Sequence, residues 1–142
     1  MLKNILKNVQ RPEIDFSALK KPRRPNGYLM SPAGYCPFPP NEISPVFDMA
    51  ARDLEAKFET IVDAEPRTEK FRTIKISNET QIDFVQYSAF FGFPDTITIR
   101  FIELGPETST LAIYSRAHYG RRDFGVNEKR IKDWMHKLKL SL

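Results

Sequence analysis

The 142-residue sequence has very few of the side chains that bind metals or form disulfides. It contains one cysteine, Cys36, and two histidines, His118 and His136. A single cysteine cannot close a disulfide within the chain, and the three residues show none of the paired spacings of zinc sites. We therefore expect no disulfide framework, no metal site and no bound cofactor.

Long apolar runs are also missing. No stretch approaches the roughly 20 apolar residues that a membrane span needs. The first ten residues, MLKNILKNVQ, are too often interrupted by Lys and Asn for the apolar region of a signal peptide. The length suits one domain. These absences predict a single-domain cytoplasmic protein with no membrane span, and they leave peripheral contact with a membrane open.

Charge is unevenly distributed along the chain. The net charge is +4, yet residues 1–24 and 116–142 each carry +5, whereas residues 25–115 carry −6. Basic ends can lie against acidic surfaces of the same domain, or they can form a basic face for an anionic partner. The modest total charge argues against a dedicated nucleic-acid-binding domain.

Proline is concentrated near the N-terminus, where eight of the 11 prolines lie between Pro12 and Pro45. Proline cannot donate a backbone hydrogen bond and restricts the residue before it. We therefore expect a basic tail over residues 1–22 and an extended, irregular arm over residues 23–44. The arm is rich in apolar side chains, so we expect it to wrap over the rest of a single domain that spans residues 23–142.

Hydrophobic periodicity predicts the remaining elements. Ser44-Pro45 resembles a helix start, and apolar residues then recur at helical spacing over residues 45–62. Alternating patterns separated by short turns predict strands at 69–76, 81–90, 96–104 and 109–118. Asn127 is a suitable N-cap for an amphipathic helix over 127–139. The predicted fold is α+β: a four-stranded antiparallel meander with two amphipathic helices on one face and a Pro-rich N-terminal arm.

The stretch SRAHYGRRDFGVNEKR, residues 115–130, is the strongest candidate for a functional site. Strand alternation places Tyr114, Arg116 and His118 on one face, and the chain then turns toward a helix N-terminus. Arginine guanidinium groups suit carboxylates and phosphates, and a helix N-terminus favours anions. The predicted ligand-binding residues are Tyr114, Arg116, His118, Arg121, Arg122, Asp123, Asn127 and Arg130. The expected ligand is an acidic small molecule, a lipid headgroup or an acidic protein segment.

Other interpretations of these residues stay open. Asp95 or Asp123 can pair with Arg116 or Arg130, so that the arginines lock the strand-to-helix corner. An enzyme could use His118 as an acid or base, whereas pairing of Cys36 with His118 has little support in a Pro-rich segment. A third possibility is an assembly or stability factor that contacts another chain through its N-terminal arm. Nothing in the sequence determines the oligomeric state.

The same stretch resembles the C-terminal signature of an uncharacterised bacterial and plastid family, the domain of unknown function numbered 1499. The matching positions are Ser115, Arg116, Gly120, Asp123, Gly125, Asn127, Arg130 and Ile131, with Phe93-Pro94-Asp95 and Arg24-Pro25-Asn26 upstream. The resemblance covers about residues 23–140. Ala117 and His118 replace a serine and a second arginine of the family pattern. The resemblance implies no activity. From the residues of the strand-to-helix corner, we expect a non-catalytic binding module.

Overall fold

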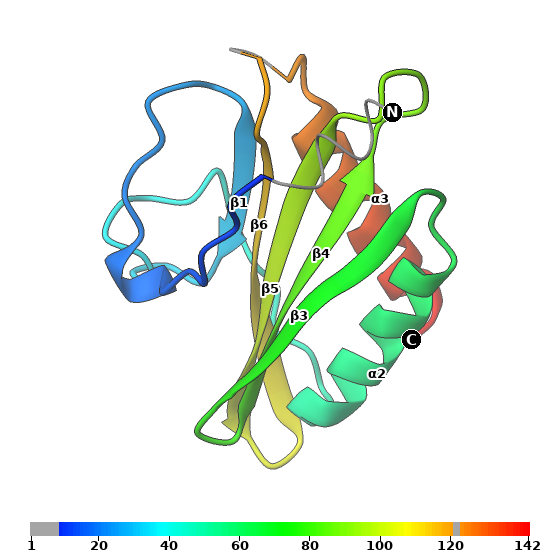
Figure 1. The fold of residues 1–142 in the computed structure, drawn as a ribbon. Helices are drawn as coiled ribbons and strands as arrows, with labels where there is room; N and C mark the ends of the chain where they lie inside the picture. The colour runs from blue at the N-terminus through cyan, green and yellow to red at the C-terminus, as the bar shows by residue number, and fades with distance from the viewer. Residues whose placement is uncertain (1–8, 121–122) are drawn as a thin grey trace.

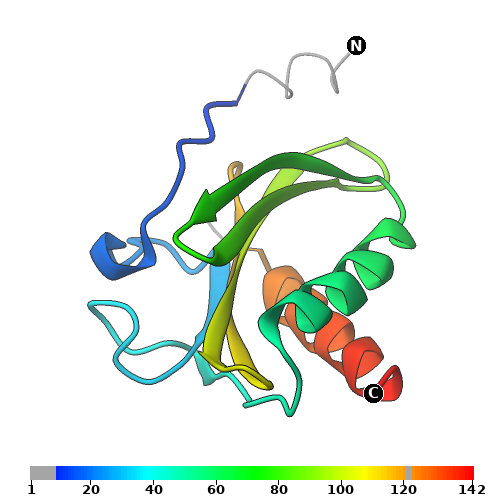
Figure 2. The ribbon, with the colours of Figure 1, turned by 90° about the horizontal axis from the view of Figure 1, so that it is seen from below.

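The computed structural model describes residues 9–120 and 123–142. A six-stranded sheet has the order β2-β1-β6-β5-β4-β3 and curls around two helices (Figures 1 and 2). The elements are the short 3-10 helix η1 (Phe16–Ala18), β1 (Gly27–Ser31), β2 (Glu42–Ile43), α2 (Ala51–Asp63), β3 (Thr68–Ile76), β4 (Glu79–Tyr87), β5 (Pro94–Gly105), β6 (Thr108–Ala117) and α3 (Val126–Leu140). The α+β class is confirmed.

The predicted four-stranded antiparallel meander is wrong, because the Pro-rich arm contributes two more strands. β1 pairs antiparallel with β6, and β2 pairs parallel with β1. The run Gly27–Ser31 contains no proline, so its amides are available for the ladder even though prolines flank it. A Cβ on Gly27 would lie 3.1 Å from the Ser115 carbonyl oxygen, which explains the glycine where the two strands approach closely.

α2 begins at Ala51 and not at the predicted residue 45, because the residues before it are held by the sheet. The Ser44 hydroxyl lies 3.0 Å from the Thr110 hydroxyl, and it caps no helix. The backbone of Phe47 exchanges two hydrogen bonds with Ser109, at 2.7 and 3.0 Å. A chain bonded in this way to the end of β6 cannot also form the first turn of a helix.

α3 has a different N-terminus from the predicted one. The cap position is Gly125, in the left-handed conformation at φ +79°, and the Asp123 carboxylate accepts from the backbone amides of Gly125 and Asn127. Asp123 therefore supplies the capping that the sequence suggested for Asn127. The Asn127 side chain is consequently free to turn inward toward β6.

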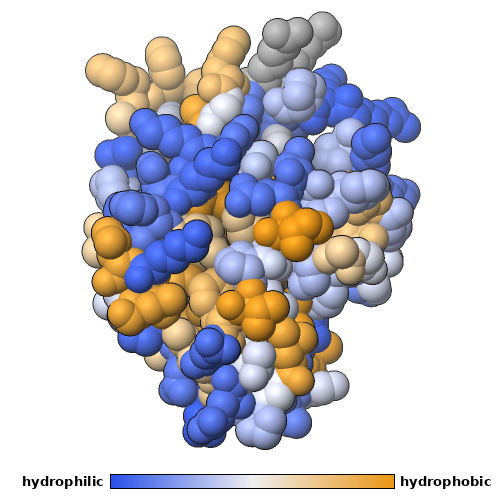
Figure 3. Space-filling model, turned by 180° about the vertical axis from the view of Figure 1, so that it is seen from behind, coloured by the Kyte–Doolittle hydropathy of each residue, from blue (hydrophilic) through white to orange (hydrophobic). Residues whose placement is uncertain are grey.

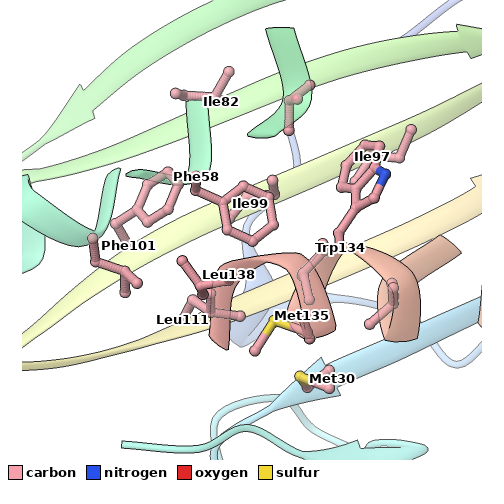
Figure 4. Close-up of a cluster of buried hydrophobic side chains, with 14 of the residues drawn as sticks. Met30, Phe58, Ile82, Ile97, Ile99, Phe101, Leu111, Trp134, Met135 and Leu138 are labelled. Atoms are coloured by element: carbon pink, nitrogen blue, oxygen red, sulfur yellow. The ribbon is translucent and has the colours of Figure 1, made fainter. Parts of the chain in front are cut away.

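The main core lies between the sheet and the two helices (Figure 4). Phe58 of α2 packs edge-on against Trp134 of α3 and Phe101 of β5. A smaller core lies on the opposite face, where Phe16 of η1 packs in one cluster with Leu29 of β1 and Tyr114 of β6. The sheet thus has a helix face and an arm face, and both are covered by the chain itself.

Candidate anion-binding site

The sheet divides the predicted site into two clusters. Successive residues of β6 point to opposite faces. Tyr114, Arg116 and His118 lie on the arm face, whereas Ser115 points toward α3. The residues Asp123, Asn127 and Arg130 gather on the helix face, and Arg121 and Arg122 lie outside the described residues. The eight residues therefore do not form one constellation.

On the helix face, Arg130 is held by four partners, and we call this group the corner cluster. Its guanidinium donates to Asp95 at 2.9 Å, to Gln86 at 2.6 Å, and to the side chains of Ser115 and Asn127. The Arg130 and Asp95 side chains are 9% and 15% exposed, so this ion pair is largely buried. Burial raises the pKa of Asp95 although Arg130 opposes that change.

Asn127 joins the corner cluster to the arm. It is fully buried, and its amide oxygen accepts from the Ser115 hydroxyl and from Arg130. Its amide nitrogen donates to the Asn26 carbonyl at 3.1 Å and to Asp123 at 2.7 Å. The corner cluster thus satisfies its own charges and hydrogen bonds, as a structural joint does.

On the arm face lies a second group, which we call the arginine cluster: Arg11, Arg72 and Arg116, together with the carboxylate of Asp83. Arg72 donates to Asp83 from Nε at 2.9 Å and approaches it with Nη2 at 2.8 Å. Arg116 donates to the Thr98 hydroxyl at 3.1 Å, and that hydroxyl donates in turn to Asp83. Burial lowers the pKa of Arg116, and the nearby positive charges of Arg11 and Arg72 lower it further.

Arg11 enters the arginine cluster from the N-terminal segment, far from the residues that the sequence highlighted. It is 6% exposed and donates from Nε to the Thr96 hydroxyl at 3.0 Å and from Nη1 to the Val9 carbonyl at 3.2 Å. Its Nη2 is buried and has no hydrogen-bond partner among the described residues. The guanidinium groups of Arg11 and Arg72 both lie over the Phe71 ring, at 5.4 and 5.2 Å from its centroid.

The arginine cluster carries more positive than negative charge. Within the described residues, Asp83 is the one carboxylate that accepts directly from these guanidinium groups, through Arg72. Glu69, on the same face, accepts from the Tyr87 hydroxyl. The undescribed residues 1–8 and 121–122 contain no Asp or Glu, so they cannot supply the missing carboxylate. Buried guanidinium groups without a counter-charge are costly unless an anion is bound.

His118 borders the arginine cluster. Its Nε2 lies 2.5 Å from the Thr96 hydroxyl, which also accepts from Arg11. Burial lowers the pKa of His118 to about 4, and the charges of Arg116 and Arg11 add to that change. The imidazole is therefore neutral at pH 7 and is a weak base there. Cys36 is buried beside Tyr114 in the smaller core, and burial raises the pKa of its thiol away from the reactive range.

The sequence signal for Arg11 and Asp83 was weak. Arg11 lies in the segment that the composition presented as a basic tail, and Asp83 sits in a strand whose register the sequence does not determine. The register places Asp83 opposite Arg72 on β3 and Thr98 on β5. Within the described ranges, no three metal-ligating side chains come together. None of the helices described is both long and apolar enough to cross a bilayer.

Comparison with known proteins gives a family and no activity. No curated protein and no solved structure matches the chain significantly. The family model described as "Protein of unknown function (DUF1499)" matches residues 17–138, which include both clusters except for Arg11. The resemblance seen in the C-terminal motif is therefore confirmed over most of the sequence, and the chain belongs to the DUF1499 family.

Proposed function

We propose that the protein is a non-catalytic binding module whose arginine cluster accepts an anionic group, such as the phosphate or carboxylate of a small acidic molecule. The observation that carries this proposal is the charge imbalance on the arm face. Of the three guanidinium groups in the cluster, only that of Arg72 bonds directly to the single carboxylate, Asp83. Arg116 reaches Asp83 through the Thr98 hydroxyl, and one buried guanidinium nitrogen of Arg11 has no partner among the described residues.

The corner cluster has a different role in this proposal. Arg130 is neutralised by Asp95, and Asn127 ties the helix to β6 and to the arm. These contacts fix the C-terminal part of β6, and β6 carries Arg116 on its other face. The corner cluster therefore positions the anion site without contacting the ligand.

The hydrogen-bonding capacity of the arginine cluster suits an oxyanion. Guanidinium groups present forked donors that match the oxygens of phosphate and carboxylate. The Thr96 and Thr98 hydroxyls, which lie between the arginines, add small polar groups on the same face. A neutral His118 can also donate one hydrogen bond or become protonated when an anion binds beside it.

A titration of the two histidines by NMR tests this proposal directly. Inorganic phosphate and sulfate serve as probes at low salt, because exposed charges are then least screened. We expect either anion to raise the pKa of His118 above its value of about 4. The exposed His136 on α3 is an internal control, and its NMR signals should not respond to either anion.

Variants then locate the bound anion. In Arg11→Gln and Arg116→Gln, phosphate should no longer move the His118 titration or raise the melting temperature. Arg100→Gln is the matched control, because Arg100 lies on the same sheet face but is paired with Glu79 at 2.8 Å. An unchanged His118 titration in the wild type, or an equal response in all variants, would contradict the proposal.

A further inference from the structure

One end of the molecule exposes an unusual number of aromatic side chains, and we call it the aromatic end. Its members come from the β4–β5 connection and the β6–α3 connection. Their exposed fractions are 96% for Phe90, 63% for Phe91, 39% for Phe93, 42% for Tyr119 and 90% for Phe124. Figure 3 shows apolar side chains projecting at the upper edge of the molecule, where the β4–β5 connection lies.

Contacts between the rings hold much of this surface together. Phe91 stacks on Phe93 with a centroid distance of 5.5 Å, and Phe93 stacks on Tyr119 at 5.7 Å. The stack joins two connections that are 26 residues apart in sequence, between positions 93 and 119. The stacked rings therefore make the aromatic end a contiguous apolar surface. Single exposed apolar residues are common on proteins, whereas contiguous patches mark interaction sites.

Backbone conformation also keeps an aromatic ring in solvent at this end. Phe124 has a φ of +51°, a conformation that bulky residues rarely adopt. Asp123 on one side and Gly125 on the other belong to the cap of α3, so the cap geometry presents Phe124 outward. Residues held in such sparsely populated backbone conformations cluster at functional sites.

Basic residues approach the aromatic end. The segment before β1, with Lys20, Lys21, Arg23 and Arg24, contains no acidic residue and is exposed at all four of these positions. It leads to Asn26, whose amide donates to the Gly120 carbonyl beside Tyr119. The described segment that leads to this contact therefore carries four basic residues and no acidic residue.

We propose that the aromatic end inserts into the interface of an anionic lipid bilayer. Aromatic rings partition favourably into the headgroup region, and basic residues beside them are attracted to anionic lipids. Stable peripheral binding needs two such signals, and this end provides both. The charge of the surrounding segments favours a lipid surface over a neutral apolar partner. This inference does not rest on the arginine cluster.

Vesicle sedimentation with the full chain tests the inference. The probes are vesicles of phosphatidylcholine alone and vesicles with about 30% phosphatidylglycerol. We expect the wild type to bind the anionic vesicles roughly tenfold or more tightly than the neutral ones at low salt. Replacing Phe90 and Phe91 by Ser should weaken binding to anionic vesicles by a factor of roughly ten or more relative to the wild type, because two rings no longer insert.

Matched variants separate the two signals. Arg23→Gln with Arg24→Gln should remove most of the preference for anionic vesicles. As controls, Val46→Ser with Leu104→Ser removes exposed apolar side chains elsewhere, and Lys57→Gln with Lys139→Gln removes the same charge near the C-terminal end of α3. Neither control should change vesicle binding by more than roughly twofold.

A fluorescent reporter gives an independent measurement. The native Trp134 is 1% exposed in the core, so its emission should stay constant. In Phe90→Trp, emission should shift to the blue when anionic vesicles are added. No vesicle binding by the wild type would overturn the inference and would leave a protein as the partner of this end. Binding that is lost in Arg116→Gln but kept without Phe90 and Phe91 would overturn it too, because a headgroup would then be held by the arginine cluster.

Discussion

The corner cluster and the arginine cluster include neighbouring residues of β6, Ser115 and Arg116, on opposite faces of the sheet, yet they differ in charge balance. Arg130, on the helix face, has a buried carboxylate partner and three further hydrogen-bond acceptors. Arg116, on the arm face, donates to a threonine hydroxyl and a backbone carbonyl, and the nearby carboxylate of Asp83 is already paired with Arg72. The same residue type is therefore a joint on one face and a surplus charge on the other.

This difference shows how structural and ligand-binding arginines can be told apart. A structural arginine is most stable when residues of the same fold neutralise its charge and accept its hydrogen bonds. A ligand-binding arginine must leave some of its hydrogen-bond donors and its positive charge unpaired within the fold, so that they can pair with a ligand. From the sequence alone, Arg116 and Arg130 are equally good candidates for ligand binding, because both lie in the same basic stretch.

The largest expected effect follows from breaking the balanced pair. Arg130→Ala should lower the free energy of unfolding by about 3–5 kcal/mol, because it leaves Asp95 buried without its counter-charge. Urea unfolding at pH 7 measures this effect. Since burial already raises the pKa of Asp95, the loss should be smaller at pH 4, where the carboxyl group can bind a proton.

The exposed neighbour Lys129 provides the control for that measurement. Lys129→Ala should change the free energy of unfolding by less than about 0.5 kcal/mol. A similar small effect for Arg130→Ala would mean that the ion pair contributes little and that the corner cluster is not a structural joint.

The next effect in size concerns Asn127. Asn127→Ala should lower the free energy of unfolding by about 1–3 kcal/mol, because Ser115, Arg130 and the Asn26 carbonyl lose buried hydrogen-bond partners. The melting temperature of Asn127→Ala, compared with that of Glu128→Ala at the adjacent helix position, checks this expectation. Equal melting temperatures for the two variants would contradict it.

Asn127 also shows what sequence patterns can and cannot predict. The position of Asn127 near the start of a helix was predictable, because apolar spacing and small residues indicate the boundary. Its inward side chain was not, because Asp123 performs the capping in its place. Helical and strand periodicity report which residues share a face, so the placement of Tyr114, Arg116 and His118 on one face of the sheet could be predicted from alternation alone.

The pairing partners across the sheet were beyond the sequence patterns. The strand Gly27–Ser31 was hidden among prolines, and its pairing with β6 converts the predicted sheet into a mixed six-stranded one. Arg11 reaches Thr96, 85 residues away, by a contact that no local pattern encodes. Long-range register decides which charges meet, and a single sequence does not specify it.

A smaller effect is expected from pH on the arginine-cluster side. The pKa of His118 is about 4 in the folded chain, below the value of 6.5 for an unperturbed histidine. Between pH 4 and pH 6.5 the unfolded chain binds a proton at His118 that the folded chain does not, and this lowers the free energy of unfolding. The folded state is therefore most stable, with respect to His118, above pH 6.5, and it loses stability as the pH falls toward 4. Solvent screening of the partly exposed ring reduces the effect to about 1 kcal/mol.

Comparison of His118→Gln with His136→Gln isolates this contribution. On acidification from about pH 7 to pH 5, the wild type and His136→Gln should lose more free energy of unfolding than His118→Gln does. Parallel losses in all three proteins would show that the His118 ring titrates normally and that the neighbouring guanidinium groups do not act on it.

The smallest expected effect is the most discriminating, because its sign is reversed. In anion-free buffer, Arg116→Met should raise the free energy of unfolding by about 0.5–1 kcal/mol, since it removes a surplus buried charge and leaves an apolar side chain over the Tyr114 ring. Arg100→Met, on the same sheet face, removes the partner of Glu79 and should lower it. Addition of phosphate should then stabilise the wild type and leave Arg116→Met unchanged. A destabilised Arg116→Met would place Arg116 with Arg130 among the structural arginines, and the distinction between the two clusters would fail.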